Sequence, residues 1–364
     1  MEILWFVGYC VDFPKLLAYR VGGHPDWNRH VVYRAIKDGY LSVYRGTYRN
    51  RVINSLRLTD AGVDYLGERD PASLALILAR KEHEQTSSHT SAERVMRAHA
   101  MAVALVMAYN AGAKILPQDK PPLVLDSNRS VLIDPETTYF YSNSELRSAI
   151  YKSDPKAAVK GSRNVGIIIR GHRLFFLYFT GHSRMFWMPA TEDNFAGAVE
   201  ALLHARGFPA AVSAQVLIAN RMAVAERIVR YSKSHSKCDR RYFRVSPEYN
   251  NCFFILNNAD GDLLLSYIID LKKQQRVNVN ILSEYLPPKS ASREYDAITQ
   301  DGNQPVILGY QCDLLPLIMM DESIPGFQGS PIVLCTDYQM NTIQSILGPL
   351  IEVRSIPEEV FHEG

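Results

Sequence analysis

Between residues 13 and 37 the chain reads Phe13-Pro-Lys-Leu-Leu-Ala-Tyr-Arg20, a Gly22-Gly23 break, and Pro25-Asp-Trp-Asn-Arg-His-Val-Val-Tyr-Arg-Ala-Ile-Lys37. The apolar spacing predicts two helices separated by a tight turn. A strand pair is expected next, at 40–44 and 52–58, around the basic tip Arg45-Gly-Thr-Tyr-Arg-Asn-Arg51. This order of helix, turn, helix and basic hairpin is typical of a winged helix-turn-helix, whose second helix enters the DNA major groove.

Charge is informative in this chain only where it is uneven, because the 364 residues carry a formal net charge of +2. Residues 20–57 hold eight Arg or Lys against Asp26 and Asp38, and residues 227–244 hold seven against Asp239. Local basic patches on a nearly neutral protein favour a localised polyanion site. The second run also interleaves Tyr and Phe, which suits either a second DNA contact or an exposed loop after a helix.

The expected second helix has one apolar and one polar side. Its predicted core face comprises Trp27, Val31, Val32, Ala35 and Ile36. Asn and Arg can make bidentate contacts to base edges, and basic residues can contact phosphates. The predicted DNA contacts on this helix are Asn28, Arg29, Arg34 and Lys37, and those of the hairpin are Arg45, Tyr48, Arg49 and Arg51. The alternative is a winged helix used only for protein contacts, with its arginines in solvent.

Cysteine usage indicates a reducing compartment. The five cysteines are far apart and form no CxxC pair, so neither a zinc ribbon nor a disulfide framework is predicted. The first residues lack the pattern of a signal peptide, and no apolar run is long enough for a membrane span. We expect a cytoplasmic protein with no membrane partner.

The remaining pattern predicts an α+β fold. Thr59 is placed to cap a helix, long helices fill 71–112, and a Pro-rich break follows at 117–122. Strands are expected at 123–125, 131–133, 138–141, 165–169, 174–180, 185–189, 252–256, 263–269, 306–310 and 331–335, and helices at 143–152, 191–206 and 211–227. The expected division is a winged-helix DNA-binding domain (1–70), a helical linker region (71–116), an α/β domain (123–284) and a C-terminal α/β extension (305–364). An exposed loop is expected at 285–304.

Two short motifs carry a family resemblance. Gly39-Tyr-Leu41 before the hairpin and Leu58-Thr-Asp-Ala-Gly62 after it resemble the N-terminal half of the replication-relaxation proteins of bacterial conjugative and mobilisable elements. The resemblance covers residues 10–110 and includes His99, which matches a histidine on the helix after the wing. Many transcription regulators share the same Gly-Tyr-Leu and Leu-Thr-x-x-Gly motifs.

This resemblance also implies a restriction-endonuclease-like core. The matching stretches are 139–146, 165–169, 174–181 and 187–192. An active nuclease of this type needs an acid on one strand and an acid-x-Lys on the next. Because 165–169 and 174–178 carry no carboxylate, we expect a degenerate core that is a catalytically inactive scaffold.

A rival site would make the protein a metal-dependent nuclease. Asp260 and Asp262 on a turn could share a metal ion with Asp270, while Lys272 orients a water. Acidic turns and Asp-x-Lys triplets also occur in solvated hairpins, which is the other interpretation. His83 and His89 lie six residues apart, on different helix faces, so no metal site is expected there.

Together these patterns predict a sequence-specific DNA-binding accessory protein of a plasmid or conjugative element, acting in transfer or replication initiation or in its transcriptional control. No catalysis and no cofactor are expected. The expected partners are double-stranded DNA, a relaxase, replication initiator or RNA polymerase, and a second copy in a homodimer. The alternatives are the nuclease using Asp262, Asp270 and Lys272, and a ligand-sensing transcription regulator.

Overall fold

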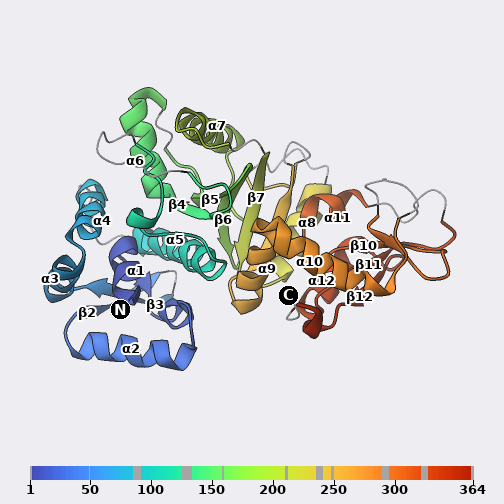
Figure 1. Cartoon of the computed structure of the whole chain (residues 1–364), viewed down its shortest axis with the longest axis horizontal. Helices are drawn as coiled ribbons and strands as arrows, with labels where there is room; N and C mark the ends of the chain where they lie inside the picture. Colours follow the sequence, from blue (N-terminus) through green and yellow to red (C-terminus); the bar gives the residue numbers. More distant parts are fainter. Residues whose placement is uncertain are drawn as a thin grey trace. The chain divides into compact units, whose positions relative to one another are not determined.

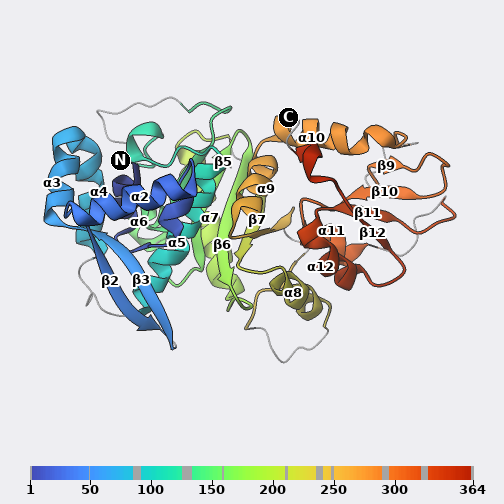
Figure 2. The ribbon, with the colours of Figure 1, turned by 90° about the horizontal axis from the view of Figure 1, so that it is seen from below.

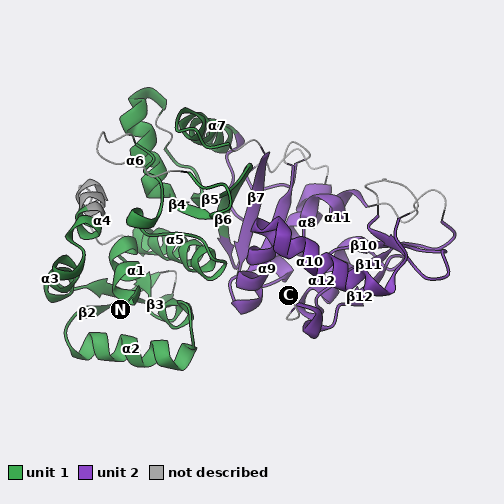
Figure 3. Cartoon of the chain, in the orientation of Figure 1, with its two compact units in different colours: residues 1–179, 190–211 green, residues 180–189, 212–364 purple. Residues whose placement is uncertain are grey.

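The computed structural model is an α+β protein with several sheets. It divides into two compact units, residues 1–179 with 190–211 (unit 1) and residues 180–189 with 212–364 (unit 2), as Figure 3 shows. The described residues are 2–48, 50–84, 92–124, 133–157, 160–209, 212–234, 241–246, 250–288, 295–320 and 327–361.

Unit 1 begins with a small antiparallel sheet surrounded by helices (Figure 1). Its elements are α1 (Glu2–Cys10), β1 (Phe13–Pro14), the 3-10 helix η1 (Leu17–Arg20), α2 (Pro25–Lys37), β2 (Leu41–Tyr48), β3 (Arg51–Leu58) and α3 (Asp60–Arg69). The strand order is β1-β3-β2, so the first strand pairs with the far side of the β2–β3 hairpin. The side chain of Thr59 caps α3 by accepting from the Gly62 amide, as the sequence predicts.

The helix expected at 13–20 is wrong. That segment is β1, a turn and η1, because Phe13 and Pro14 pair with Leu56 and Ser55 of β3. The first helix is instead α1, and nearly all of its residues are buried. Tertiary pairing with a strand forty residues away overrides the local helical spacing.

The rest of unit 1 places helices against the antiparallel strands β4, β5 and β6 of a second sheet. Its elements are α4 (Pro71–Glu84), α5 (Ala92–Asn110), η2 (Pro117–Asp119), β4 (Tyr139–Ser142), α6 (Asn143–Ser153), η3 (Pro155–Ala157), β5 (Asn164–Arg170), β6 (Arg173–Gly181) and α7 (Pro189–Ala205). Helix α5 contacts both α1 and β5. It therefore joins the N-terminal elements and the second sheet into one core.

Unit 2 is built from parallel strands joined by helices. Its elements are β7 (Val212–Ala219), α8 (Ala223–Lys233), β8 (Cys252–Leu256), α9 (Ala259–Ile269), α10 (Leu271–Ile281), η4 (Leu282–Glu284), β9 (Ala297–Ile298), β10 (Pro305–Leu308), α11 (Leu314–Met319), β11 (Ile332–Cys335), α12 (Asp337–Leu347), β12 (Glu352–Ser355) and η5 (Glu358–Phe361). Strands β7 and β8 are parallel, and so are β10, β11 and β12, whose sheet ends in the antiparallel β9.

Two expectations for unit 2 are wrong. The helix expected at 211–227 is β7 followed by α8, since β7 is buried on both faces and such strands lack polar alternation. The strand expected at 263–269 lies in α9, which is buried nearly all round. Periodicity alone does not separate a buried strand from a buried helix, but the N-cap Asn258 was a helix signal.

Smaller differences concern loops. The expected strand at 185–189 is reduced to one β-bridge, between Phe186 and Tyr242. Leu123 and Val124 lie outside any strand, and residues 125, 131 and 132 are outside the described residues. The expected exposed loop at 285–304 contains β9, whose two residues are buried.

The described cysteines, Cys10, Cys252, Cys312 and Cys335, are buried free thiols, and Cys238 is outside the described residues. No helix of the described chain combines the length and apolar character needed to cross a membrane.

Candidate nucleic-acid interface

Helix α2 has well-defined ends. The N-cap His24 accepts a hydrogen bond at Nδ1 from the Asp26 amide (3.3 Å), and Pro25 occupies the first helical position. At the other end Gly39 adopts a positive φ of 80°, and the Tyr40 amide donates to the Ala35 carbonyl (2.9 Å). The ring of Tyr40 then packs on Tyr65 of α3 at 4.7 Å. The helix is therefore fixed at both ends.

Asn28 does not lie on the outer face of α2, and its expected contact with bases is corrected. The residue is buried, and its amide donates to the carbonyls of Tyr19 (3.2 Å), Val21 (2.9 Å) and Gly22 (2.7 Å). These carbonyls belong to η1 and the turn before α2. Asn28 thus positions α2 on that turn and has no side-chain donor left to address DNA.

The outer face of α2 is partly aromatic. Trp27 is 69% exposed and Tyr33 67% exposed, so assigning Trp27 to the core face was wrong. Val32 is the apolar residue of this helix that is fully buried. Arg34 and Lys37 lie on the exposed side in the last turns of the helix.

Arg29 is exposed but already engaged. Its guanidinium lies 3.4 Å from the Asp26 carboxylate and 5.5 Å from the centre of the Tyr19 ring. Because both members of the ion pair are well exposed, this contact stabilises the helix little and can open for another anion.

The β2–β3 hairpin is longer and tighter than the sequence predicts. The register pairs Leu41 with Leu58 and continues to Tyr48 opposite Arg51, which leaves a two-residue loop. Asn50 in this loop has a positive φ of 62°, which asparagine tolerates better than most residues. Figure 2 shows the hairpin projecting beyond the helices of unit 1. The distal strands carry Arg45 and Arg51, both exposed, and the half-buried Tyr48, while Arg49 is outside the described residues.

The base of the hairpin is a partly buried polar network. Nε of Arg57 donates to Asp12 (2.6 Å), and its guanidinium lies 3.9 Å from the centre of the Tyr44 ring. On the same strand the Ser55 hydroxyl lies 2.7 Å from Nε2 of His99 on α5. Burial lowers the pKa of His99 to about 4, against a smaller opposing effect of Asp12. His99 is therefore neutral at pH 7 and fastens the hairpin to α5.

Four cations of this region remain available. Within the described part of the chain, no ion pair or side-chain hydrogen bond engages Arg34, Lys37, Arg45 or Arg51. Two of them lie on α2 and two on the hairpin. Since α2 and β2 are in contact, these charges belong to one continuous part of unit 1. This arrangement can attract a polyanion.

A buried lysine ties the N-terminal elements to the second sheet. Lys120 is 3% exposed, and its ammonium contacts Glu145 (2.9 Å), the Phe140 carbonyl (2.7 Å) and the hydroxyl of Tyr9 on α1 (3.2 Å). Tyr9 also donates to Glu145, which closes the N-cap of α6 with Ser142. The sequence offered no signal for this network, because Tyr9 lies more than a hundred residues from both Lys120 and Glu145.

The stretches expected to match a nuclease core contain two carboxylates, and both are engaged. Glu145 accepts from Lys120 and Ser142, while Glu192 of α7 accepts from the Arg163 amide (2.7 Å) and the Ser162 hydroxyl (2.7 Å). Burial raises the pKa of Glu192, and these hydrogen bonds partly offset the effect. Strands β5 and β6 supply mainly buried apolar side chains.

The rival site is not assembled. Asp262 is buried in the first turn of α9, and Asp270 caps α10 by accepting from the amides of Lys272 (3.0 Å) and Lys273 (3.2 Å). The two carboxyl-bearing positions are therefore separated by roughly 12 Å of helix rise, too far to share one ion. Lys272 is exposed on α10, and the element directly before α10 is the helix α9 rather than a strand. Across the described residues, no group of three or more His, Cys, Asp or Glu is arranged to hold a metal ion.

No protein-family model, curated protein or solved structure matches this chain.

Proposed function

We propose that unit 1 binds double-stranded DNA as a winged helix-turn-helix, with α2 in the major groove and the β2–β3 hairpin along the backbone. The observation that carries this proposal is the set of four exposed cations without partners on α2 and the hairpin. Phosphate contacts from such residues provide most of the affinity of DNA-binding modules, while contacts to base edges provide specificity.

The order of the elements supports the proposal. A winged helix has a helix, a strand, a second helix, the recognition helix and a two-stranded wing, with the first strand paired to the wing. Here α1, β1, η1, α2 and the β2–β3 hairpin follow that order, and β1 pairs with β3. Helix α2 also exposes Trp27 and Tyr33, and apolar contact with a thymine methyl group is one way in which a recognition helix reads bases.

In this proposal the protein is a non-enzymatic, cytoplasmic accessory factor of a plasmid or conjugative element, in line with the resemblance to replication-relaxation proteins. It marks an origin or a promoter, and recruits a relaxase, replication initiator or RNA polymerase. The degenerate nuclease-like core serves as scaffold.

The test is selection of genomic DNA fragments by the full-length protein, followed by anisotropy on the selected duplex and a scrambled one. Arg34→Ala on α2 is expected to weaken binding to the selected duplex by about 1–3 kcal/mol and to reduce discrimination. Arg45→Ala on the hairpin is expected to weaken binding to the selected and the scrambled duplex equally. Failure to enrich any fragment, or identical behaviour of the α2 and hairpin variants, would contradict the proposal.

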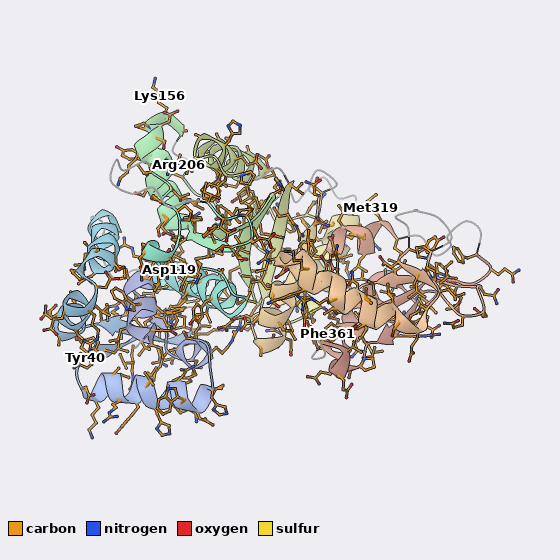
Figure 4. All side chains as sticks on the ribbon, viewed as in Figure 1. Tyr40, Asp119, Lys156, Arg206, Met319 and Phe361 are labelled. Carbon is orange, nitrogen blue, oxygen red and sulfur yellow. The ribbon has the colours of Figure 1, made fainter. Side chains whose placement is uncertain are left out.

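Lys156→Ala is a matched control. Lys156 is an exposed cation of the same unit, and Figure 4 shows it far from Tyr40 at the end of α2. Its replacement should leave both affinities unchanged. Equal losses with Lys156→Ala and Arg45→Ala would indicate unspecific attraction to the whole unit.

A further inference from the structure

A short ribbon in unit 2 presents aromatic and basic side chains on one face. Phe186 and Tyr242 form its β-bridge, with hydrogen bonds from the Trp187 amide to the Arg241 carbonyl and from the Phe243 amide to the Met185 carbonyl (2.9 Å each). Met185, Trp187 and Phe243 are buried. Phe186, between Met185 and Trp187, is 52% exposed, and Met188, after Trp187, is 67% exposed. The buried residues thus anchor a ribbon whose other face is open.

The exposed rings are interleaved with guanidinium groups. The Phe186 ring lies on Tyr242 at 4.8 Å with an interplanar angle of 30°. Arg184 lies 4.3 Å from the Tyr231 ring centre and 4.4 Å from that of Tyr242, and Arg244 lies 4.6 Å from Tyr231. These contacts hold the cations beside the aromatic surface rather than free in solvent.

The charge of the ribbon has one sign. Residues 181–189 and 241–246 contain Arg184, Arg241 and Arg244 and no Asp or Glu. Arg230 of the neighbouring helix α8 donates to the Glu226 carboxylate (2.5 Å), so its charge adds little to the positive potential of the ribbon. An apolar protein segment would have to desolvate these guanidiniums without supplying a countercharge, whereas a phosphate backbone supplies one at every residue.

We propose that this ribbon, Arg184–Met188 with Arg241–Arg244, binds single-stranded nucleic acid. An unpaired base stacks on the exposed face of Phe186, and Arg184 and Arg244, which lie beside the same aromatic rings, contact the flanking phosphates. Stacking on aromatic side chains beside a basic track is the usual chemistry of single-strand binding. A duplex hides the faces of its bases, so the ribbon discriminates against double-stranded DNA. The site is independent of the duplex site proposed on unit 1.

The test is anisotropy of the full-length protein with a labelled oligothymidylate of about 16 nucleotides, long enough for one single-strand site. Phe186→Ala is expected to weaken binding about tenfold or more, the loss of one stacked base, while Phe186→Tyr retains it. Arg184→Gln is expected to weaken binding and to flatten its salt dependence. Leu350→Ala and Arg276→Gln are matched exposed controls in unit 2 and should bind as the native protein does.

The two proposed sites can fail separately. Arg45→Ala on the hairpin should leave oligothymidylate binding intact, and Phe186→Ala should leave duplex binding intact. The ribbon proposal would be overturned if both Phe186→Ala and Arg184→Gln bound oligothymidylate with native affinity, or if the native protein did not bind it at all. It would also be overturned if Phe186→Ala weakened duplex binding as much as single-strand binding.

Discussion

The base and the distal half of the β2–β3 hairpin use the same residue types differently. At the base, Arg57 is held by Asp12 and the Tyr44 ring, and Ser55 by His99. In the distal half, Arg45 and Arg51 are exposed and make no ion pair with any described residue. The basic run that the sequence presents as one feature therefore has a structural part and an available part.

This difference shows why a count of basic residues overstates a binding surface. Of the eight basic residues between 20 and 57, Arg57 stabilises the fold and Arg29 pairs with Asp26. Arg34, Lys37, Arg45 and Arg51 are the described cations left for a partner. An engaged cation should affect stability when it is removed, and an available one should affect binding.

The largest effect is expected for the most deeply engaged cation, Lys120. Lys120→Met leaves Glu145, whose side chain is only 15% exposed, without its countercharge, and should lower the free energy of unfolding by about 3–5 kcal/mol. Denaturant unfolding of the full chain measures this loss. Lys156→Met, at an exposed position, should change stability by less than about 0.5 kcal/mol.

A double variant keeps the prediction testable even if the Lys120→Met protein does not fold. Adding Glu145→Gln removes the unpaired charge and should recover part of the lost stability. A single variant as stable as the native protein would contradict the engaged role of Lys120.

Acidification should weaken the attachment of the hairpin base. The pKa of His99 falls from 6.5 to about 4 on folding, so the unfolded chain takes up the proton first as the pH falls. The associated stability is complete above pH 6.5 and is lost towards pH 4, and a shift of this size corresponds to about 3 kcal/mol.

His99→Gln keeps a hydrogen-bonding side chain but does not titrate. The stability difference between native protein and this variant should therefore shrink or reverse between pH 6.5 and 4. Parallel curves of unfolding free energy against pH would show that His99 does not contribute in this way.

Arg57→Ala and Arg45→Ala compare the two halves of the hairpin directly. Arg57→Ala deprives the buried Asp12 of its partner and should cost about 1.5–3 kcal/mol of stability. Arg45→Ala should cost less than about 0.5 kcal/mol, because its side chain is exposed. Urea unfolding measures the free energy of unfolding of both variants. Equal losses of stability in Arg57→Ala and Arg45→Ala would remove the distinction between engaged and available cations.

The smallest effect is expected at Trp27. The sequence pattern placed Trp27 in the core, where truncation to alanine costs about 3–5 kcal/mol. Since Trp27 is 69% exposed, Trp27→Ala should change stability by less than about 0.5 kcal/mol. A loss near the core value in thermal unfolding would contradict the exposed position, and Val32→Ala provides the buried control.

Local signals predicted part of the structure. Pro25 at a helix start and Asp38-Gly39 at its end fixed α2, the cap at Thr59 fixed the start of α3, and the apolar run 252–256 matched β8. The failures arose where distant residues decide. Residues 13–20 form no α-helix because Phe13 and Pro14 pair with β3. Residues 263–269 lie in α9, and because that helix is buried nearly all round, its sequence shows no helical alternation of polar and apolar residues.

The candidate interface was predicted in outline only. Its helix and hairpin were anticipated, as was the exposure of Arg34, Lys37, Arg45 and Arg51. The sequence could not show that Asn28 turns inward or that Arg57 is bound to Asp12, since each depends on a partner brought close only by folding. The sequence indicated the run 227–244 as one candidate for a second DNA contact, but it could not show that Tyr242 pairs with Phe186, for the same reason.

The central claim is that the available cations of α2 and the hairpin bind duplex DNA. Its most direct test is the salt dependence of duplex affinity for the full-length native protein and for the triple variant Arg34→Ala/Arg45→Ala/Arg51→Ala. Each lost phosphate contact should reduce the slope of log affinity against log salt by about 0.9, so the triple variant should lose about 2.7. Native affinity that is insensitive to salt, or a triple variant with the native slope, would contradict the account.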